Sequence, residues 1–346
     1  MVFNTGFQEQ SPNHQFYSLP IIRYFSGVFY KLLKIYARLT IHLYCPRIII
    51  NRPEVATWEG PLLLAANHPN SFLDGIILTT LLDNKLYSLA RGDAFKKKWL
   101  NRFLRSIHLL PVYRTSEGVE NLEHNYTTFR ACIDAFKKGH IVLIFSEGRC
   151  ENEWHLRPLK KGTARLASSA WQNNIALTVL PVAFNYSSFK KFGKELHLYF
   201  GRPISYNDID QTIPEGKQNL QFNNLLQEQL QSMVYEIDDN DNEKIDATFA
   251  RRKDLRFYLL LIPGLIGYIL HLPLLAFCTF IAKRGFSTSG HYDSVQTSLF
   301  LISYPFYMVA LSIVTFTINP VLGFITPVAL YLTAWASAQI KYVLNL

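Results

Sequence analysis

Cysteine is scarce in this sequence, and it shows no metal-binding spacing. The four cysteines, Cys45, Cys132, Cys150 and Cys278, are scattered over 346 residues without a CxxC pair. No two of the ten histidines stand four residues apart with a glutamate between them, as zinc proteases require. The sequence therefore predicts isolated, reduced thiols on a chain facing the cytoplasm, and gives no reason to expect a metal site.

Nucleic-acid signatures are also missing, although the chain is basic. Thirty-five Lys and Arg residues against 26 Asp and Glu give a formal net charge of +9. A basic chain can bind nucleic acid, anionic lipid or a phosphorylated substrate. The sequence has no zinc-finger spacing, RNP-type strand or arginine-rich tract. We therefore expect no nucleic-acid partner and favour lipid or phosphate.

Two long C-terminal stretches lack formal charge altogether. Phe257–Ala282 and Ser294–Ile340 contain no Asp, Glu, Lys or Arg. Both can cross about 30 Å of hydrocarbon, and the second can cross twice with a turn near Asn319. The first is interrupted by Pro263 and Pro273. We expect it to form a kinked hairpin that re-enters one leaflet, because flanking Lys and Arg then stay on the cytoplasmic side.

The N-terminal region has no cleavable signal, since polar residues run from Asn4 to Gln15. Residues 20–45 are apolar and aromatic, with a polar stripe at intervals of three and four residues. This pattern predicts an amphipathic helix in a membrane interface, with its cations at lipid phosphates. An ordinary helix packed on the core is the alternative. The stripe consists of Arg23, Gly27, Lys31, Lys34, Arg38 and His42.

Between about Arg47 and Ser205, short aliphatic runs alternate with helical stretches. This predicts an α/β domain with a parallel or mixed sheet flanked by helices, and sites at the carboxyl ends of strands. We divide the chain into a tail and interfacial helix (1–45), an α/β domain with a trailing helix (46–250), and a hydrophobic membrane domain with transmembrane helices (251–346). Expected strands are Ile48–Asn51, Leu62–Ala66, Leu86–Ala90, Ile141–Phe145, Leu177–Phe184 and Glu195–Phe200; expected helices are Ser71–Leu82, Ala94–Ser106, Val119–Lys137, Gly162–Gln172 and Leu220–Ile237.

Residues 67–74, Asn-His-Pro-Asn-Ser-Phe-Leu-Asp, follow a predicted strand and open a helix. A neutral imidazole can take a proton from an alcohol near neutral pH, and a carboxylate can fix its tautomer. The pattern predicts His68 as general base and Asp74 as its orienting partner, with no Ser or Cys nucleophile. Alone, the two residues could also be ordinary surface side chains.

This stretch resembles the first motif of the glycerolipid acyltransferase family, in which Asn-His is followed after four residues by Asp. Five residues intervene here, which is similar to fungal-type glycerol-3-phosphate and dihydroxyacetone-phosphate acyltransferases. Three segments that resemble the later family motifs follow in order. They are 109–114, LLPVYR; 145–149, FSEGR, in which Ser146 stands where the family has Pro; and 179–182, VLPV.

The resemblance implies roles for particular residues. Arg114 would hold the acceptor phosphate, for which a guanidinium is well shaped. Glu147 and Gly148 would help bind the glycerol-phosphate group, and Arg149 adds a cation beside them. Lys161 precedes a predicted helix, whose positive N-terminal end also favours phosphate.

The resemblance further implies an O-acyltransferase of phospholipid synthesis. A fatty acyl group would pass from acyl-CoA or acyl carrier protein, as co-substrate, to a hydroxyl of glycerol 3-phosphate, with backbone N–H groups stabilising the oxyanion. A 1-acylglycerol-3-phosphate or other lysolipid acceptor is the alternative, and a non-catalytic anionic-lipid-binding membrane protein is the alternative of another class. The expected partners are membrane lipids, the acyl thioester and the phosphorylated glycerol; no cofactor is implied, and the catalytic domain would face the cytoplasm.

Overall fold

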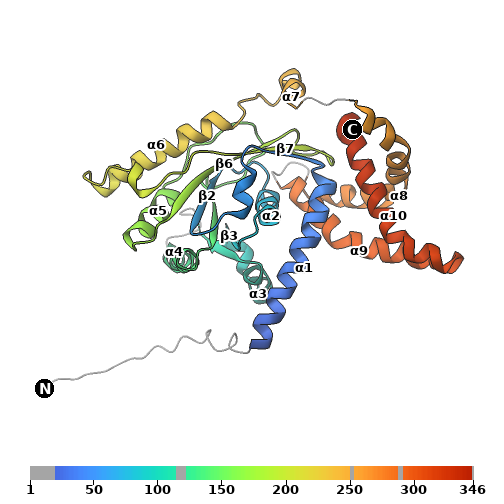
Figure 1. Cartoon of the computed structure of the whole chain (residues 1–346), viewed down its shortest axis with the longest axis horizontal. Coiled ribbons are helices and arrows are strands. Elements are labelled where there is room, and N and C mark those ends of the chain that lie inside the picture. The colour runs from blue at the N-terminus through green and yellow to red at the C-terminus, as the bar shows by residue number, and fades with distance from the viewer. Residues whose placement is uncertain (1–19, 114–121, 250–252, 287–290, 345–346) are drawn as a thin grey trace.

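A seven-stranded sheet forms the centre of the structure, with helices on both faces (Figure 1). The computed structural model describes residues 20–113, 122–249, 253–286 and 291–344. The strand order is β1-β7-β6-β2-β5-β3-β4, and every pair is parallel except β6 with β7. The predicted α/β class with a mixed sheet is confirmed. The strands are β1 Arg47–Ile50, β2 Leu62–Ala66, β3 Leu86–Arg91, β4 Leu109–Val112, β5 Ile141–Phe145, β6 Thr178–Tyr186 and β7 Glu195–Phe200.

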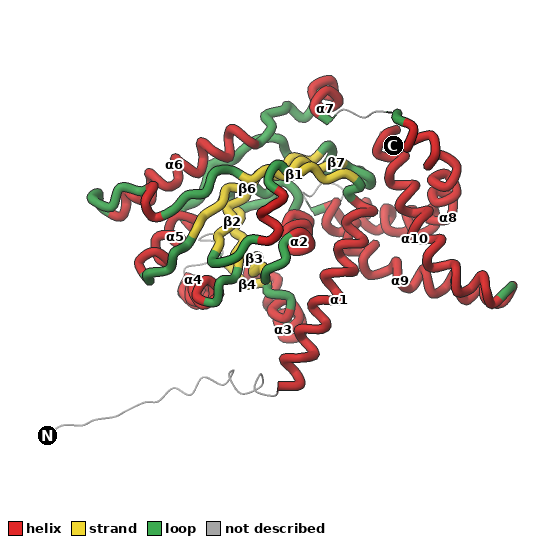
Figure 2. The backbone as a smooth tube through the Cα atoms, in the orientation of Figure 1, coloured by secondary structure: helices red, strands yellow, loops and turns green. Residues whose placement is uncertain are grey.

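The central strands are buried on both sides because alternate residues enter two separate cores. On β2, Leu62 and Leu64 contribute to one core, and Leu63 and Ala65 to the other. The first core lies under α1 Pro20–Tyr44, α2 Phe72–Leu81 and α7 Asn242–Thr248. The second lies under α4 Leu122–Lys137, α5 Gly162–Gln172 and α6 Glu215–Met233, which cover the other face in Figure 2.

The sequence did not predict β4 as a strand. Pro111 stands inside it, and a proline cannot donate a ladder hydrogen bond. The position is tolerated because β4 is the last strand of the sheet. The helix predicted at Ala94–Ser106 is shorter than expected: a 3-10 turn at Gly92–Phe95 precedes α3, Lys98–Ser106.

Three C-terminal helices are long and apolar enough to cross a membrane: α8 Leu255–Phe286, α9 Tyr292–Ile318 and α10 Pro320–Leu344. The predicted break near Asn319 is confirmed, whereas the re-entrant hairpin is wrong, because α8 continues as one helix through both of its prolines. Small residues let α10 pack closely against α8. A Cβ added to Gly267 would lie 2.0 Å from the Thr333 carbonyl oxygen.

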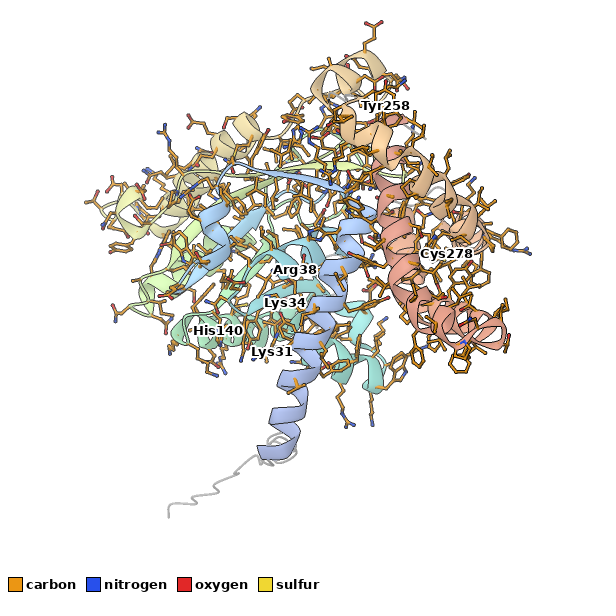
Figure 3. The ribbon with its side chains drawn as sticks, turned by 45° about the vertical axis from the view of Figure 1, so that its right-hand side comes forward. Lys31, Lys34, Arg38, His140, Tyr258 and Cys278 are labelled. Atoms are coloured by element: carbon orange, nitrogen blue, oxygen red, sulfur yellow. The ribbon has the colours of Figure 1, made fainter. Side chains whose placement is uncertain are left out.

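Helix α1 is amphipathic as predicted, but part of its polar stripe faces protein. Lys34 donates to the Leu82 carbonyl, and Arg38 Nε donates to the Thr80 carbonyl at 2.9 Å (Figure 3 labels both side chains). Carbonyls at a helix C-terminus lack intrahelical partners and carry partial negative charge, so they attract these cations. The expected lipid contact of these two residues is therefore corrected. Five large apolar side chains of α1 are also exposed: Val28, Phe29, Leu32, Ile35 and Leu39.

Candidate active site

His68 and Asp74 are brought together between the end of β2 and the first turn of α2. His68 Nδ1 lies 3.0 Å from Asp74 Oδ2. Asn67 fixes the start of this loop, since its side chain exchanges hydrogen bonds with the Phe184 backbone at 2.8 and 3.2 Å. The pair therefore lies at the carboxyl ends of parallel strands, where the sequence placed it.

The Asp74 carboxylate is fully buried and accepts three hydrogen bonds. Oδ2 accepts from His68 Nδ1 and from the Asn70 N–H at 2.9 Å, and Oδ1 accepts from the Tyr186 hydroxyl at 2.7 Å. These donors compensate the lost hydration of the charge. An ionised carboxylate can only accept, so the proton on the His68 ring belongs on Nδ1 and Nε2 is the basic nitrogen.

The His68 ring stacks on Phe145, with centroids 3.6 Å apart and planes 15° apart. Its backbone N–H donates to Glu147 Oε2 at 2.8 Å, and Glu147 Oε1 accepts from the Arg157 N–H at 3.0 Å. Both oxygens of Glu147 are thus bound to the backbone of two loops. These two hydrogen bonds position the His68 backbone relative to the loop that carries Arg157.

Burial raises the pKa of the Glu147 carboxyl from 4.5 to about 7, against the opposing effect of its two N–H donors. The folded chain therefore binds this proton more tightly than the unfolded chain. The contribution of this protonated carboxyl to stability is fully present below the pKa that Glu147 has in the unfolded chain. It is lost as the pH rises through the pKa that Glu147 has in the folded chain.

For Glu147→Gln we expect a pH-dependent difference from the wild type. The free energy of unfolding of the wild type, relative to that of the variant, should increase by about 2 kcal/mol between pH 8 and pH 5.5, because only the wild type gains the proton. Urea unfolding of both purified proteins in detergent at the two pH values measures this. A difference that stays constant with pH would contradict the raised pKa.

The predicted cationic residues lie around the same loops. Gly148 has a φ of +71°, which glycine adopts without strain, and a Cβ there would lie 3.0 Å from Lys160 Cγ. Lys161 immediately precedes α5, as the sequence indicated. Arg149 Nε lies 3.4 Å from Glu151 Oε1, with its side chain half exposed. Arg114 lies outside the described residues.

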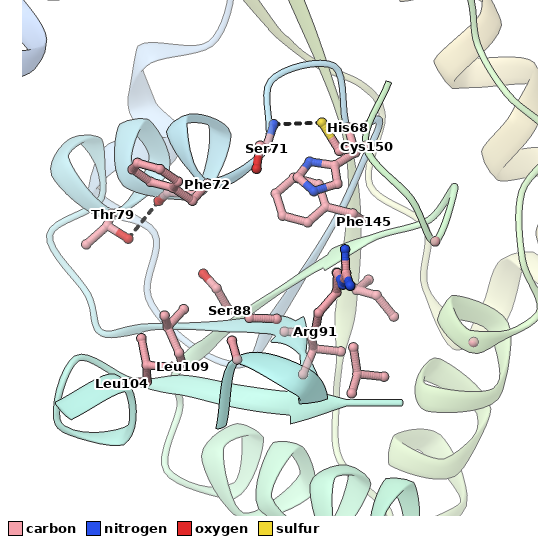
Figure 4. A pocket seen from close by; sticks show the side chains of 18 of the residues that line it. His68, Ser71, Phe72, Thr79, Ser88, Arg91, Leu104, Leu109, Phe145 and Cys150 are labelled. Atoms are coloured by element: carbon pink, nitrogen blue, oxygen red, sulfur yellow. Dashed lines mark hydrogen bonds between the residues drawn. The ribbon is translucent and has the colours of Figure 1, made fainter. Parts of the chain in front are cut away.

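A cavity of about 2600 Å³ is lined by His68 and by the loop residues Gly148, Arg149 and Lys161. It exceeds the usual 300–1,000 Å³ of small-molecule pockets, so it has room for two substrates. Most of its cations come from α4, α5 and the loop before α5, whereas α1, α2, α3 and α9 supply mainly apolar side chains. Figure 4 shows His68, Phe72, Ser88 and Leu109 around this space. The cation set consists of Lys34, Arg91, Arg130, Lys137, Arg149, Lys160, Lys161 and Arg165.

Comparison with known proteins identifies the central segment. Residues 47–185 match the family model described as Acyltransferase. The chain carries an acyltransferase domain. A 1-acyl-sn-glycerol-3-phosphate acyltransferase of Bacillus subtilis (strain 168) is 28% identical over 157 residues, which cover 44% of this chain and 70% of that protein. The crystal structure of the 1-acyl-sn-glycerophosphate acyltransferase PlsC from Thermotoga maritima superposes with a TM-score of 0.45 at 14% identity, covering 63% of this chain and 83% of that one.

Several side chains around His68 and Asp74 were not singled out from the sequence. Tyr186 stands four residues beyond the last predicted motif and reaches Asp74 from the end of β6. Asn70 lies inside the first motif, but nothing in its spacing indicated that its N–H binds Asp74. Phe145 carries the stacking face for His68. Pairing of β6 with β2 brings Tyr186 near α2, and this long-range contact leaves no local sequence signal.

Cys150 in the acyltransferase domain site is not placed to act as a nucleophile. Its Sγ accepts the Ser71 N–H at 2.9 Å (Figure 4). Burial raises the pKa of this thiol, so the reactive thiolate is disfavoured. The cysteines of the described residues are not joined by disulfides. Among the described residues, no group of three or more His, Cys, Asp or Glu side chains is arranged to hold a metal.

Proposed function

We propose that this chain transfers a fatty acyl group from an acyl thioester to a hydroxyl of a phosphorylated glycerol, with His68 as general base and Asp74 as its orienting partner. The 3.0 Å contact between His68 Nδ1 and Asp74 Oδ2, in a cavity with a cationic side and an apolar side, carries this proposal. Acyl-CoA or acyl carrier protein is the donor.

The chemistry requires one proton transfer in each direction. The acceptor oxygen attacks the thioester carbon while its proton passes to His68 Nε2, and the tetrahedral intermediate then expels the thiolate. The imidazolium returns the proton to the leaving sulfur. The buried Asp74 charge stabilises the imidazolium. General acid–base catalysis by a positioned side chain such as His68 contributes typically 10²- to 10⁴-fold.

The two sides of the cavity match the two halves of a glycerolipid substrate. The acceptor phosphate binds among the cations near α5, with Arg149 and Lys161 from this set; by the family resemblance, Arg114 and the Glu147-Gly148 turn contribute too. The acyl chain lies among the apolar side chains of α1, α2, α3 and α9. Because α1 and α9 also expose apolar residues, the acyl chain of the substrate enters the cavity from the bilayer. The catalytic domain lies on the cytoplasmic surface of the membrane.

We propose a 1-acylglycerol 3-phosphate as the acceptor, because the Bacillus relative bears that name and the cavity is large enough for two acyl chains. Glycerol 3-phosphate is the second candidate. It is favoured by the five residues between His68 and Asp74, the spacing that resembles fungal-type glycerol-3-phosphate acyltransferases.

Purified protein in phospholipid nanodiscs, given radiolabelled palmitoyl-CoA and either acceptor, tests this function. We expect kcat/KM for 1-acylglycerol 3-phosphate to exceed that for glycerol 3-phosphate at least tenfold. The reverse ratio would establish the second candidate. A protein that binds anionic vesicles but consumes no palmitoyl-CoA or palmitoyl acyl carrier protein with either acceptor would be a lipid-binding protein instead.

A further inference from the structure

The first turn of α9, residues 291–294, lies against the loop that joins His68 to α2. Asn70 Nδ2 donates to Asp293 Oδ2 at 2.7 Å, and the Ser294 hydroxyl donates to the Asn70 carbonyl at 3.2 Å. His291 Nδ1 lies 3.0 Å from the Ser71 hydroxyl. Residues more than 200 positions away in sequence therefore hold both the side chain and the backbone of this loop.

Asn70 connects this turn to the catalytic pair. Its backbone N–H donates to Asp74 Oδ2, the same oxygen that faces His68 Nδ1. The next residue, Ser71, has a φ of +50°, which is uncommon for residues other than glycine and persists only where neighbouring contacts hold it. A displacement of Asn70 would therefore move a donor away from the oxygen that orients the His68 ring.

Asp293 is itself held by two further elements. Its carboxylate accepts from the Lys194 ammonium, just before β7, and from the Tyr44 hydroxyl at the end of α1. Lys194 and Asp293 are both fully buried. Because a carboxylate only accepts, the Asn70 amide must turn its NH₂ group toward it. Its oxygen, Oδ1, has no partner in the described part of the chain.

A buried ion pair is weak evidence of stabilisation, because apolar residues of similar volume often serve as well. Here the pair fixes a carboxylate in one place, with three donors from three parts of the chain. The fixed Asp293 carboxylate in turn holds the Asn70 side chain in the loop between His68 and α2.

We propose that Asp293 is a positioning residue, which acts through Asn70 to hold Asp74 and His68 in line for proton transfer. The helical unit α8–α10 then takes part in catalysis as well as in membrane attachment. This inference rests on the proposed acyl transfer. Since Asp293 does not line the cavity, its loss should lower kcat and leave KM for both substrates within about twofold.

Two double variants distinguish the effect of losing the acceptor for Asn70 from the effect of losing the buried charges. Asp293→Asn with Lys194→Met removes both charges but keeps an oxygen that can accept from Asn70. Asp293→Leu with Lys194→Met removes the same charges and also the acceptor, with the same number and branching of side-chain heavy atoms. We expect the Asn variant to keep kcat within threefold of the wild type, and the Leu variant to lose ten- to hundredfold at unchanged KM.

Hydrogen exchange gives a readout that needs no turnover. The Asn70 N–H is protected by Asp74, so the peptide containing residues 68–74 should exchange faster in the Leu variant and at the wild-type rate in the Asn variant. Equal kcat in the two variants, whether both match the wild type or both fall together, would overturn the proposal.

Two single variants keep the test decisive if the Leu variant does not fold. Ser294→Ala removes only the hydroxyl that holds the Asn70 carbonyl, and should lower kcat three- to tenfold at constant KM; wild-type kcat would count against the proposal. Ser312→Ala is the matched control, because it makes the same substitution on the same helix, where the hydroxyl donates to the Met308 carbonyl within α9 and not to the loop. It should leave kcat unchanged, and a loss as large as that of Ser294→Ala would also overturn the proposal.

The failure of the underlying function looks different. A wild-type protein that consumes no acyl thioester refutes the acyl transfer itself. Normal wild-type turnover, with wild-type kcat and exchange in the Leu variant, refutes only the role of Asp293.

Discussion

His68→Ala is expected to lower kcat for acyl transfer at least about a thousandfold, since the acceptor alcohol loses the group that takes its proton. Stopped assays with radiolabelled palmitoyl-CoA in nanodiscs measure the loss. The thermal unfolding midpoint should change little, because the ring is partly exposed to the cavity and makes one side-chain hydrogen bond, with Asp74. A folded variant that keeps a tenth of wild-type turnover would refute His68 as the base.

The chain offers a matched control for this variant. His155 Nδ1 lies 2.6 Å from Glu236 Oε2, so it is also a histidine paired with a carboxylate, but it lies outside the cavity. His155→Ala should keep wild-type kcat. A loss at this position comparable to that of His68→Ala would mean that the assay reports general damage.

Asp74→Asn tests the same pair from its other side, and we expect a loss of about a hundredfold or more. The carboxylate accepts from His68, Asn70 and Tyr186, whereas an asparagine has a single acceptor oxygen. When its NH₂ group faces His68, the ring must carry its proton on Nε2, which then cannot act as a base. Asp74→Asn and His68→Ala should not be additive, because either change removes the same proton acceptor.

Ser88→Leu should shorten the acyl chains that the cavity accepts. Ser88 lies on β3 and lines the cavity opposite α2, where a Cβ on Gly75 would lie 3.9 Å from the Ser88 hydroxyl oxygen (Figure 4). A leucine at this position occupies the space of several acyl methylenes. Each buried methylene contributes about 0.8 kcal/mol, so excluding four of them corresponds to a loss of more than a hundredfold for a long chain.

The measurement compares kcat/KM for palmitoyl-CoA and octanoyl-CoA. We expect the ratio of the two to fall about a hundredfold in Ser88→Leu, with octanoyl-CoA affected less than threefold. Ser88→Ala, which adds no volume, should keep the wild-type ratio. If Ser88→Leu folds and retains the wild-type preference for palmitoyl-CoA, the acyl chain does not lie between α2 and β3.

Local sequence patterns were most reliable where the structure depends on near neighbours. Leu62–Ala66 and Ile141–Phe145 were predicted with correct bounds, since each is an uninterrupted apolar run that ends at a polar turn. The proximity of His68 to Asp74 followed from a strand-to-helix turn and six positions of separation.

Patterns that depend on a partner were less reliable. The basic stripe of α1 was assigned to lipid phosphates, but Lys34 and Arg38 bind carbonyls at the C-terminal end of α2. Periodicity shows that a helix has a polar side and does not show which surface meets it. The prolines of α8 suggested a reversal, whereas close packing against α10 accompanies a continuous helix.

The amino-acid sequence alone determined the α/β class, the charge-free helices and the His68–Asp74 pair, because each depends on residues within a few turns of one another. The tertiary structure decided the antiparallel pairing of β6 with β7, the arrival of Tyr186 at Asp74, and the contact of Asp293 with Asn70. The last two contacts join residues 112 and 223 positions apart, and their geometry is fixed by packing of the sheet and helices as a whole.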